Sequence, residues 1–78
     1  MIDLQCKMAR AALGLGVRDL AALAHVSTDT IARLERGEKL KPATIMAIAA
    51  ALETAGVIFE ADGEMVNGGP GVRLRMKE

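Results

Sequence analysis

The chain has 78 residues, enough for one domain, and its ten Lys and Arg residues balance its ten Asp and Glu residues to leave no net charge at pH 7. With one cysteine and one histidine it can form neither an internal disulfide nor a structural zinc site, which takes four ligands at regular spacing. A domain this small is marginally stable alone, so we expect support from oligomerisation, in the form of a homodimer.

Apolar residues make up 51% of the chain, but Phe59 is its one aromatic residue, which indicates a thin core of closely packed helices. The most apolar stretch, from Ala43 to Leu52, is shorter than the ~18 to 20 residues that cross a membrane. The beginning Met1-Ile2-Asp3 lacks the basic start and apolar stretch of a signal peptide. We therefore expect a cytoplasmic protein. Cys6 is expected to be a reduced core residue, with a redox switch as the alternative.

Helical spacing of apolar residues predicts a first helix from Asp3 to Leu13. Gly14 and Gly16 end it, because a glycine just past a helix adopts the left-handed conformation without a Cβ penalty. A second helix is predicted from Val17 to about Ala24, and a short turn covers residues 25 to 27.

Ser27 is a favourable N-cap, because its hydroxyl can accept a hydrogen bond from an amide of the next turn. The third helix is therefore predicted from Thr28 to about Arg36, and Gly37 ends it. After a polar loop over residues 38 to 41, Pro42 suits the first turn of a fourth helix, which runs to about Ala55.

The character of the sequence changes after residue 56. The stretch from Val57 to Glu60 is β-branched and aromatic, and Val72 to Arg75 alternates apolar and basic residues, so both are predicted strands. Asp62-Gly63 and the segment from Asn67 to Gly71 are turn signals, which indicates an antiparallel hairpin. An isolated hairpin is marginal in water, so it must pack on helices or pair with another chain.

The sequence thus predicts a mainly α fold. A compact four-helix domain would cover residues 1–56, and a C-terminal β-hairpin would form a dimerisation tail over residues 57–78.

The segment from Val17 to Arg36 carries the functional signal, because two short helices are separated by about three residues. Ala21 is small, as a close helix crossing requires. Ile31 and Leu34 lie one helical step apart and would anchor the third helix to the core. Its opposite face is left free, and such a face is the one a helix presents to the major groove of DNA.

This pattern resembles the Xre family of helix-turn-helix regulators, which includes the lambda-type phage repressors. The resemblance covers about residues 4 to 55 and implies a lambda-repressor-like domain whose third helix is the recognition helix. The tail also resembles that of many short bacterial members, and the resemblance implies a bacterial or phage origin. The matching stretches are Leu20-Ala21, Val26-Ser27, Ile31-Ala32, Leu34-Glu35-Arg36-Gly37 and Pro42 through Leu52.

The resemblance also implies roles for individual residues. Arg33 would donate two hydrogen bonds to a guanine, the commonest specific contact. Lys39 and Lys41 would contact phosphates, which position the protein without reading sequence. The residues expected at base edges or phosphates are Arg18, Ser27, Thr28, Asp29, Thr30, Arg33, Arg36 and Lys39.

Two positions depart from the family pattern, and three keep an alternative interpretation. Val17 stands where the family usually has Gln, so Arg18 would supply the contact to the DNA backbone. His25 stands where the tight turn usually has Gly, and His is among the residue types that tolerate positive φ. Asp29 either accepts from a cytosine or complements the helix N-terminus. Arg33 and Arg36 either contact DNA or pair with Asp29 and Glu35 in solvent.

We therefore expect a sequence-specific regulator that binds double-stranded DNA as a dimeric repressor, with RNA polymerase or another protein as a further partner. The alternative is a protein-interaction or antitoxin-type module on the same fold with weak or no DNA binding. No enzyme is expected, because the sequence has no nucleophile paired with a base, no glycine-rich phosphate loop and no metal cluster. No cofactor or metal is expected either.

Overall fold

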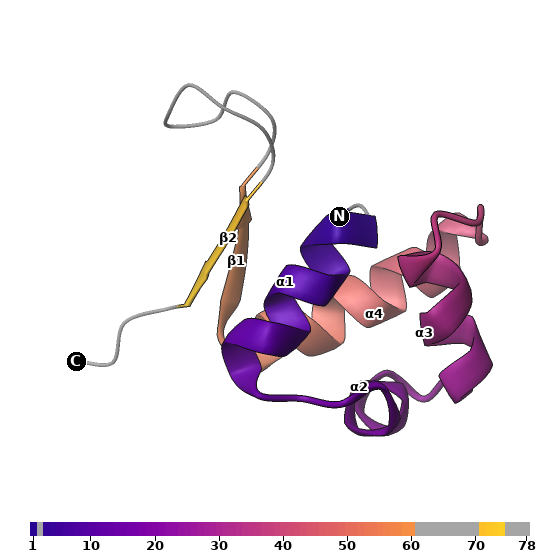
Figure 1. Cartoon of the computed structure of the whole chain (residues 1–78), viewed down its shortest axis with the longest axis horizontal. Coiled ribbons are helices and arrows are strands. Elements are labelled where there is room, and N and C mark those ends of the chain that lie inside the picture. The colour runs from indigo at the N-terminus through magenta and orange to yellow at the C-terminus, as the bar shows by residue number, and fades with distance from the viewer. Residues whose placement is uncertain (2, 61–70, 75–78) are drawn as a thin grey trace.

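The computed structural model describes residues 1, 3–60 and 71–74. Four helices are followed by a two-stranded sheet (Figure 1), so the predicted mainly α fold with a C-terminal hairpin is confirmed. The elements are α1 (Asp3–Leu13), α2 (Val17–Ala24), α3 (Thr28–Glu35), α4 (Pro42–Thr54), β1 (Val57–Glu60) and β2 (Gly71–Leu74).

Helices α1 and α2 and strand β1 have the predicted bounds, and other element ends differ by one residue. Helix α3 stops at Glu35 and Arg36 is its C-cap, while β2 begins at Gly71 instead of Val72. Arg75 and the predicted turns over residues 62–63 and 67–70 lie outside the described residues. The predicted division of the chain at residue 56 stays a prediction.

The helix ends follow from their local sequence. Gly14 ends α1 with φ 70°, and His25 ends α2 with φ 58° and ψ 43°. His25 is the one residue other than glycine with a positive φ in the described part of the chain, which confirms the prediction for this turn. At the start of α3, the Thr30 amide donates to Ser27 Oγ at 3.1 Å, so Ser27 is the N-cap as predicted.

One core joins the helices to the first strand. Cys6 is fully buried, which confirms its assignment to the core. Val57 is only 1% exposed, so β1 begins inside the core. The largest fully buried side chains are Leu20, Ile31, Ile48, Leu52, Val57 and Cys6.

The hairpin forms within one chain. Strands β1 and β2 are antiparallel, with Val57 opposite Leu74 and Glu60 opposite Gly71. They pack against α1 and α4, and Gln5 Nε2 of α1 donates to the Gly71 carbonyl at 3.0 Å. Figure 1 shows the hairpin beside α1, on the side of the molecule away from α3. The sheet is therefore remote from the helix expected to read DNA.

Candidate nucleic-acid interface

Helix α3 is held to the molecule along one side. Ile31 is fully buried and Leu34 is 4% exposed, and both belong to the core. Ala21 of α2 is 4% exposed, in agreement with the predicted close crossing of α2 and α3. Thr28, Asp29 and Arg36 are exposed, which leaves the other side of α3 open to a ligand.

Glu35 fixes the end of α3 to α1 through an ion pair. Both of its carboxylate oxygens accept from Arg10, at 2.7 Å from Nε and 2.7 Å from Nη2. The Cys6 thiol donates to Glu35 Oε2 at 3.2 Å. Because the Glu35 side chain is 9% exposed and that of Arg10 is 21% exposed, this pair is shielded from solvent.

The charges in this cluster shift one another's pKa values. The hydrogen bonds from Arg10, partly opposed by burial, hold the pKa of Glu35 below its usual 4.5. Burial, together with the hydrogen bond to Glu35, raises the pKa of Cys6 to about 12. The thiol therefore stays protonated at neutral pH, and the thiolate that redox chemistry needs is suppressed.

At the N-terminus of α3, four predicted site residues come together. Ser27 and Thr30 are joined through their hydroxyl oxygens at 2.8 Å, in addition to the capping bond. Thr28 and Asp29 are exposed in the first turn of the helix. This end of α3 thus offers two exposed side chains and two hydroxyls already engaged with each other.

At the other end of α3, Arg33 and Arg36 share one acidic partner, Glu38. Arg33 Nε donates to Glu38 Oε1 at 3.1 Å, and Arg36 donates to Oε2 from Nε at 3.1 Å and from Nη2 at 2.8 Å. The alternative to DNA contact predicted that these arginines pair with Asp29 and Glu35, but both pair with Glu38. The hydrogen bonds from Arg36 and Arg33 lower the pKa of Glu38 below 4.5, so it is ionised at neutral pH.

A hollow of about 320 Å³ opens beside these arginines, between α3 and the start of α4. Three of its lining residues are cationic, which favours an anion such as a phosphate group. Lys39 and Lys41 are exposed here, and in the described part of the chain neither forms an ion pair. The lining residues are Thr30, Arg33, Lys39, Leu40, Lys41 and Thr44.

The start of α2 is where Val17 replaces the glutamine that is usual in the resembling family. Val17 is half-buried and packs against the core, and its apolar side chain offers no hydrogen bond to DNA. Arg18, the next residue, is exposed in the first turn of α2. The Gly16 amide donates to the Asp19 carboxylate at 2.8 Å, which caps this helix.

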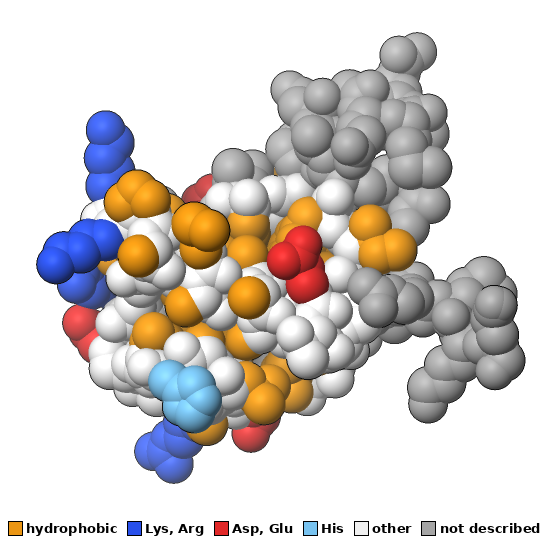
Figure 2. Space-filling view, turned by 180° about the vertical axis from the view of Figure 1, so that it is seen from behind, with side chains coloured by type: hydrophobic (Ala, Val, Ile, Leu, Met, Phe, Trp, Pro, Cys, Tyr) orange, Lys and Arg blue, Asp and Glu red, His pale blue; other side chains and the backbone are white. Residues whose placement is uncertain are grey.

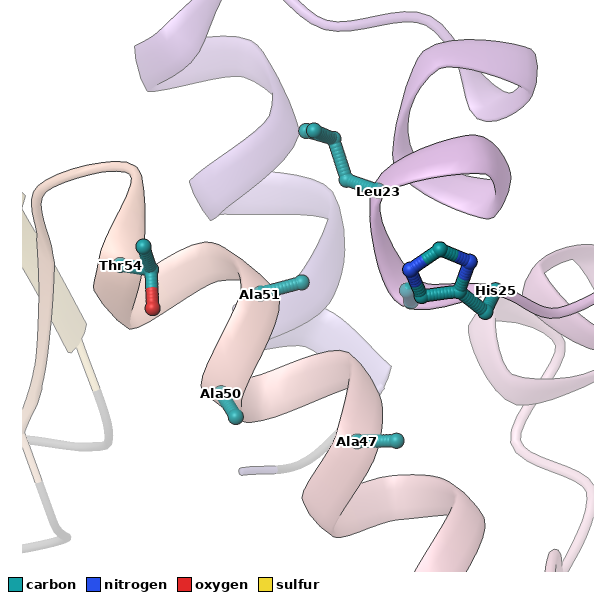
Figure 3. A pocket seen from close by; sticks show the side chains of 7 residues that line it. Leu23, His25, Ala47, Ala50, Ala51 and Thr54 are labelled. Carbon is teal, nitrogen blue, oxygen red and sulfur yellow. The ribbon is translucent and has the colours of Figure 1, made fainter.

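Helix α4 carries apolar side chains that the core does not cover. Met46 is 70% exposed and therefore does not fill a gap in the core. Figure 2 shows the side on which α4 lies in front, with apolar side chains spread over much of it. A second open hollow of about 320 Å³ lies between α2 and α4. In Figure 3, Ala47 and Ala51 point across it from α4 toward Leu23 and His25.

Glu35 and Glu38 have partners in the structure that the sequence did not predict. Leu34 and Glu35 follow Ile31 by three and four positions, which is the spacing of one helix face, so this spacing could have predicted the burial of Glu35. Glu38 falls in what was expected to be a polar loop. Its pairing depends on the backbone turn at Gly37, which sequence spacing does not describe.

Comparison with known proteins gives the family. A family model described as a helix-turn-helix domain matches residues 5–60, more than two thirds of the chain. No curated protein matches this chain. Among the described residues, no three His, Cys, Asp or Glu side chains are grouped as metal ligands, and no helix is long and apolar enough to cross a membrane. Because the family model matches most of its length, the chain belongs to the helix-turn-helix domain family, which binds DNA.

Proposed function

We propose that the protein is a non-enzymatic transcription regulator of the Xre type, which binds specific double-stranded DNA in the cytoplasm as a homodimer. The observation that carries this proposal is the exposed side of α3, with exposed polar residues in its first turn and two arginines at its end. A helix that is anchored along one side and polar along the other fits the major groove.

The base-reading roles go to residues on α3. Arg33 donates to a guanine, and Thr28 contacts a neighbouring base edge. Asp29 accepts from a cytosine amino group. Ser27 and Thr30 lie beside this surface, where their hydroxyls reach bases or phosphates.

The phosphate-binding roles go to cations on both sides of α3. Lys39 and Lys41 line the hollow between α3 and the start of α4. Arg36, the exposed C-cap residue of α3, lies near base edges or phosphates, although Glu38 already occupies part of its guanidinium. Arg18 contacts the backbone from the start of α2, in place of the glutamine usual in the family. Such contacts set affinity and its salt dependence, and they carry no sequence information.

The homodimer is proposed from the apolar surface of α4 and the hairpin. Met46 on α4 is 70% exposed, and Leu23 on the neighbouring α2 is 51% exposed. The small side chains of Ala47 and Ala50 on α4 are exposed as well. A twofold dimer would place two copies of α3 in successive major grooves ~34 Å apart. Covering a promoter in this way would repress transcription, and a contact with RNA polymerase would instead activate it.

Selection from a pool of random duplexes tests the function. The parent protein is expected to enrich a palindromic site and to lose affinity for it steeply between about 50 mM and 200 mM salt. Arg33→Ala should then weaken binding to that site by about 1–3 kcal/mol. Arg33→Lys is the matched control, because lysine keeps the charge but loses the forked donor geometry. It should keep most of the salt dependence while discriminating poorly between the selected site and random duplex.

A partner-binding module is the second candidate function, and the exposed Leu23 and Met46 favour it. In that case the pool yields no enriched sequence and the protein binds duplex DNA weakly at low salt. A Met46→Glu variant would then lose its protein partner while DNA binding stays unchanged.

A further inference from the structure

The turn at Gly37 places Glu38 against the last turn of α3. Gly37 has φ 87°, and its amide donates to the Leu34 carbonyl at 2.9 Å. The Glu38 amide then donates to the Arg33 carbonyl at 3.1 Å. The chain therefore reverses over the helix end, and the Glu38 side chain is returned toward two arginines instead of pointing along the loop.

The two arginines are held in different ways. Arg33 is bound through Nε alone, and within the described residues no group accepts from its Nη atoms. Arg36 is bound through Nε and Nη2 together, both to Glu38 Oε2. Thus one edge of the Arg36 guanidinium is occupied by a carboxylate oxygen, while Arg33 keeps its two terminal nitrogens for a ligand.

All three side chains remain accessible to DNA. The exposed fractions are 43% for Arg33, 57% for Arg36 and 44% for Glu38. A carboxylate accepts from the same guanidinium donors as a phosphate oxygen does. Glu38 is therefore a built-in competitor for any phosphate that approaches Arg36, and it also adds a negative charge that repels phosphate.

We infer that Glu38 is a specificity-determining residue, which orients Arg33 for a base edge and withholds Arg36 from phosphates. This inference rests on the proposed DNA-binding function. On a random duplex, where Arg33 finds no matching base, the protein gains little from Arg36 and dissociates readily. On the selected site, Arg33 donates its Nη atoms to a guanine while Glu38 keeps the guanidinium plane in place through Nε.

The direct test measures binding of the parent and of Glu38→Gln to two duplexes of about 24 base pairs, the selected site and a random sequence. For the random duplex we expect Glu38→Gln to bind about three- to tenfold more tightly at low salt, with a log–log salt slope steeper by about one. For the selected site the gain should be smaller, so the ratio of the two affinities falls. Glu53→Gln, the same change at an exposed position near the end of α4, controls for net charge.

A double-mutant cycle identifies Arg36 as the withheld group. Arg36→Ala should change random-duplex binding little in the parent and about three- to tenfold in the Glu38→Gln background. In the free protein, exchange of the Arg36 Nε proton measured by NMR should be faster in Glu38→Gln than in the parent.

The outcomes separate the inference from the function it rests on. If the parent selects a site with a clear salt slope but Glu38→Gln shifts both duplexes by one common factor, like Glu53→Gln, the function stands and the inference is overturned. Equal Nε exchange in the parent and Glu38→Gln overturns it as well. If neither protein binds duplex DNA, both are overturned.

Discussion

Two glutamates three positions apart, Glu35 and Glu38, both pair with arginine but in opposite surroundings. Glu35 is 8% exposed and joins α3 to α1 across 25 residues of sequence, through both oxygens. Glu38 is exposed and pairs with residues two and five positions away. Only the shielded pair crosses between elements, so it belongs to the stability of the fold. The exposed pair instead sets the charge that the surface of α3 presents.

The largest effect should come from breaking the shielded pair. Glu35→Gln removes the negative charge that pairs with Arg10 and leaves one acceptor oxygen in place of two, so we expect the free energy of unfolding to fall by about 3 kcal/mol. Urea denaturation followed by circular dichroism measures the loss. Adding Arg10→Met to Glu35→Gln should recover part of it, since no charge is then left unpaired. A loss below about 1 kcal/mol would remove the distinction between the two glutamates.

Lowering the pH should remove the contribution of Glu35 to the free energy of unfolding. The pKa of Glu35 is lowered in the folded protein, so its contribution is complete above its ordinary value of 4.5 and is lost as the pH falls through the folded-state value. Between neutral pH and about pH 3, the free energy of unfolding should therefore fall less with decreasing pH in Glu35→Gln than in the parent. Denaturation curves at several pH values measure this difference. Added salt should leave most of this difference in place, because buried pairs are screened weakly. A parallel pH dependence in both proteins would contradict the assignment.

The turn at Gly37, between the two glutamates, has a backbone conformation that favours glycine. Gly37→Ala should destabilise by about 1–2 kcal/mol, because φ 87° is unfavourable for a residue with a Cβ atom. The added Cβ would lie 3.6 Å from Asp3 Oδ2, an ordinary contact, so backbone conformation is the cause and not crowding. Gly37→Asn is the control and should cost less, since Asn tolerates positive φ. Equal losses for Ala and Asn would point to a steric cause.

The smallest effect on stability is expected at Glu38. Glu38→Gln should leave the thermal unfolding midpoint unchanged within error, because exposed ion pairs contribute little. Differential scanning calorimetry at low and physiological salt measures it. A clear fall in the midpoint at both salt concentrations would mean that Glu38 also supports the fold.

The sequence predicts the order and type of all six elements, because each boundary carries a local signal such as Ser27 before α3 or Pro42 in α4. It also predicts the anchoring of α3, since Ile31 and Leu34 follow helical periodicity. The partner of Arg10 was not predicted, because it lies 25 residues away and depends on how α1 and α3 pack. The pairing of Glu38 was not predicted either, since a reversed backbone and not the spacing brings it to Arg36.

The left-handed turn at Gly37 also bears on how such a regulator can change over time. Residue 38 lies outside the core, yet the turn returns it to the surface of α3. A substitution there alters the charge offered to DNA without disturbing the packing that selection on stability must keep. If Glu38 acts as proposed, single substitutions at this position would strengthen or weaken DNA binding while the fold stays intact.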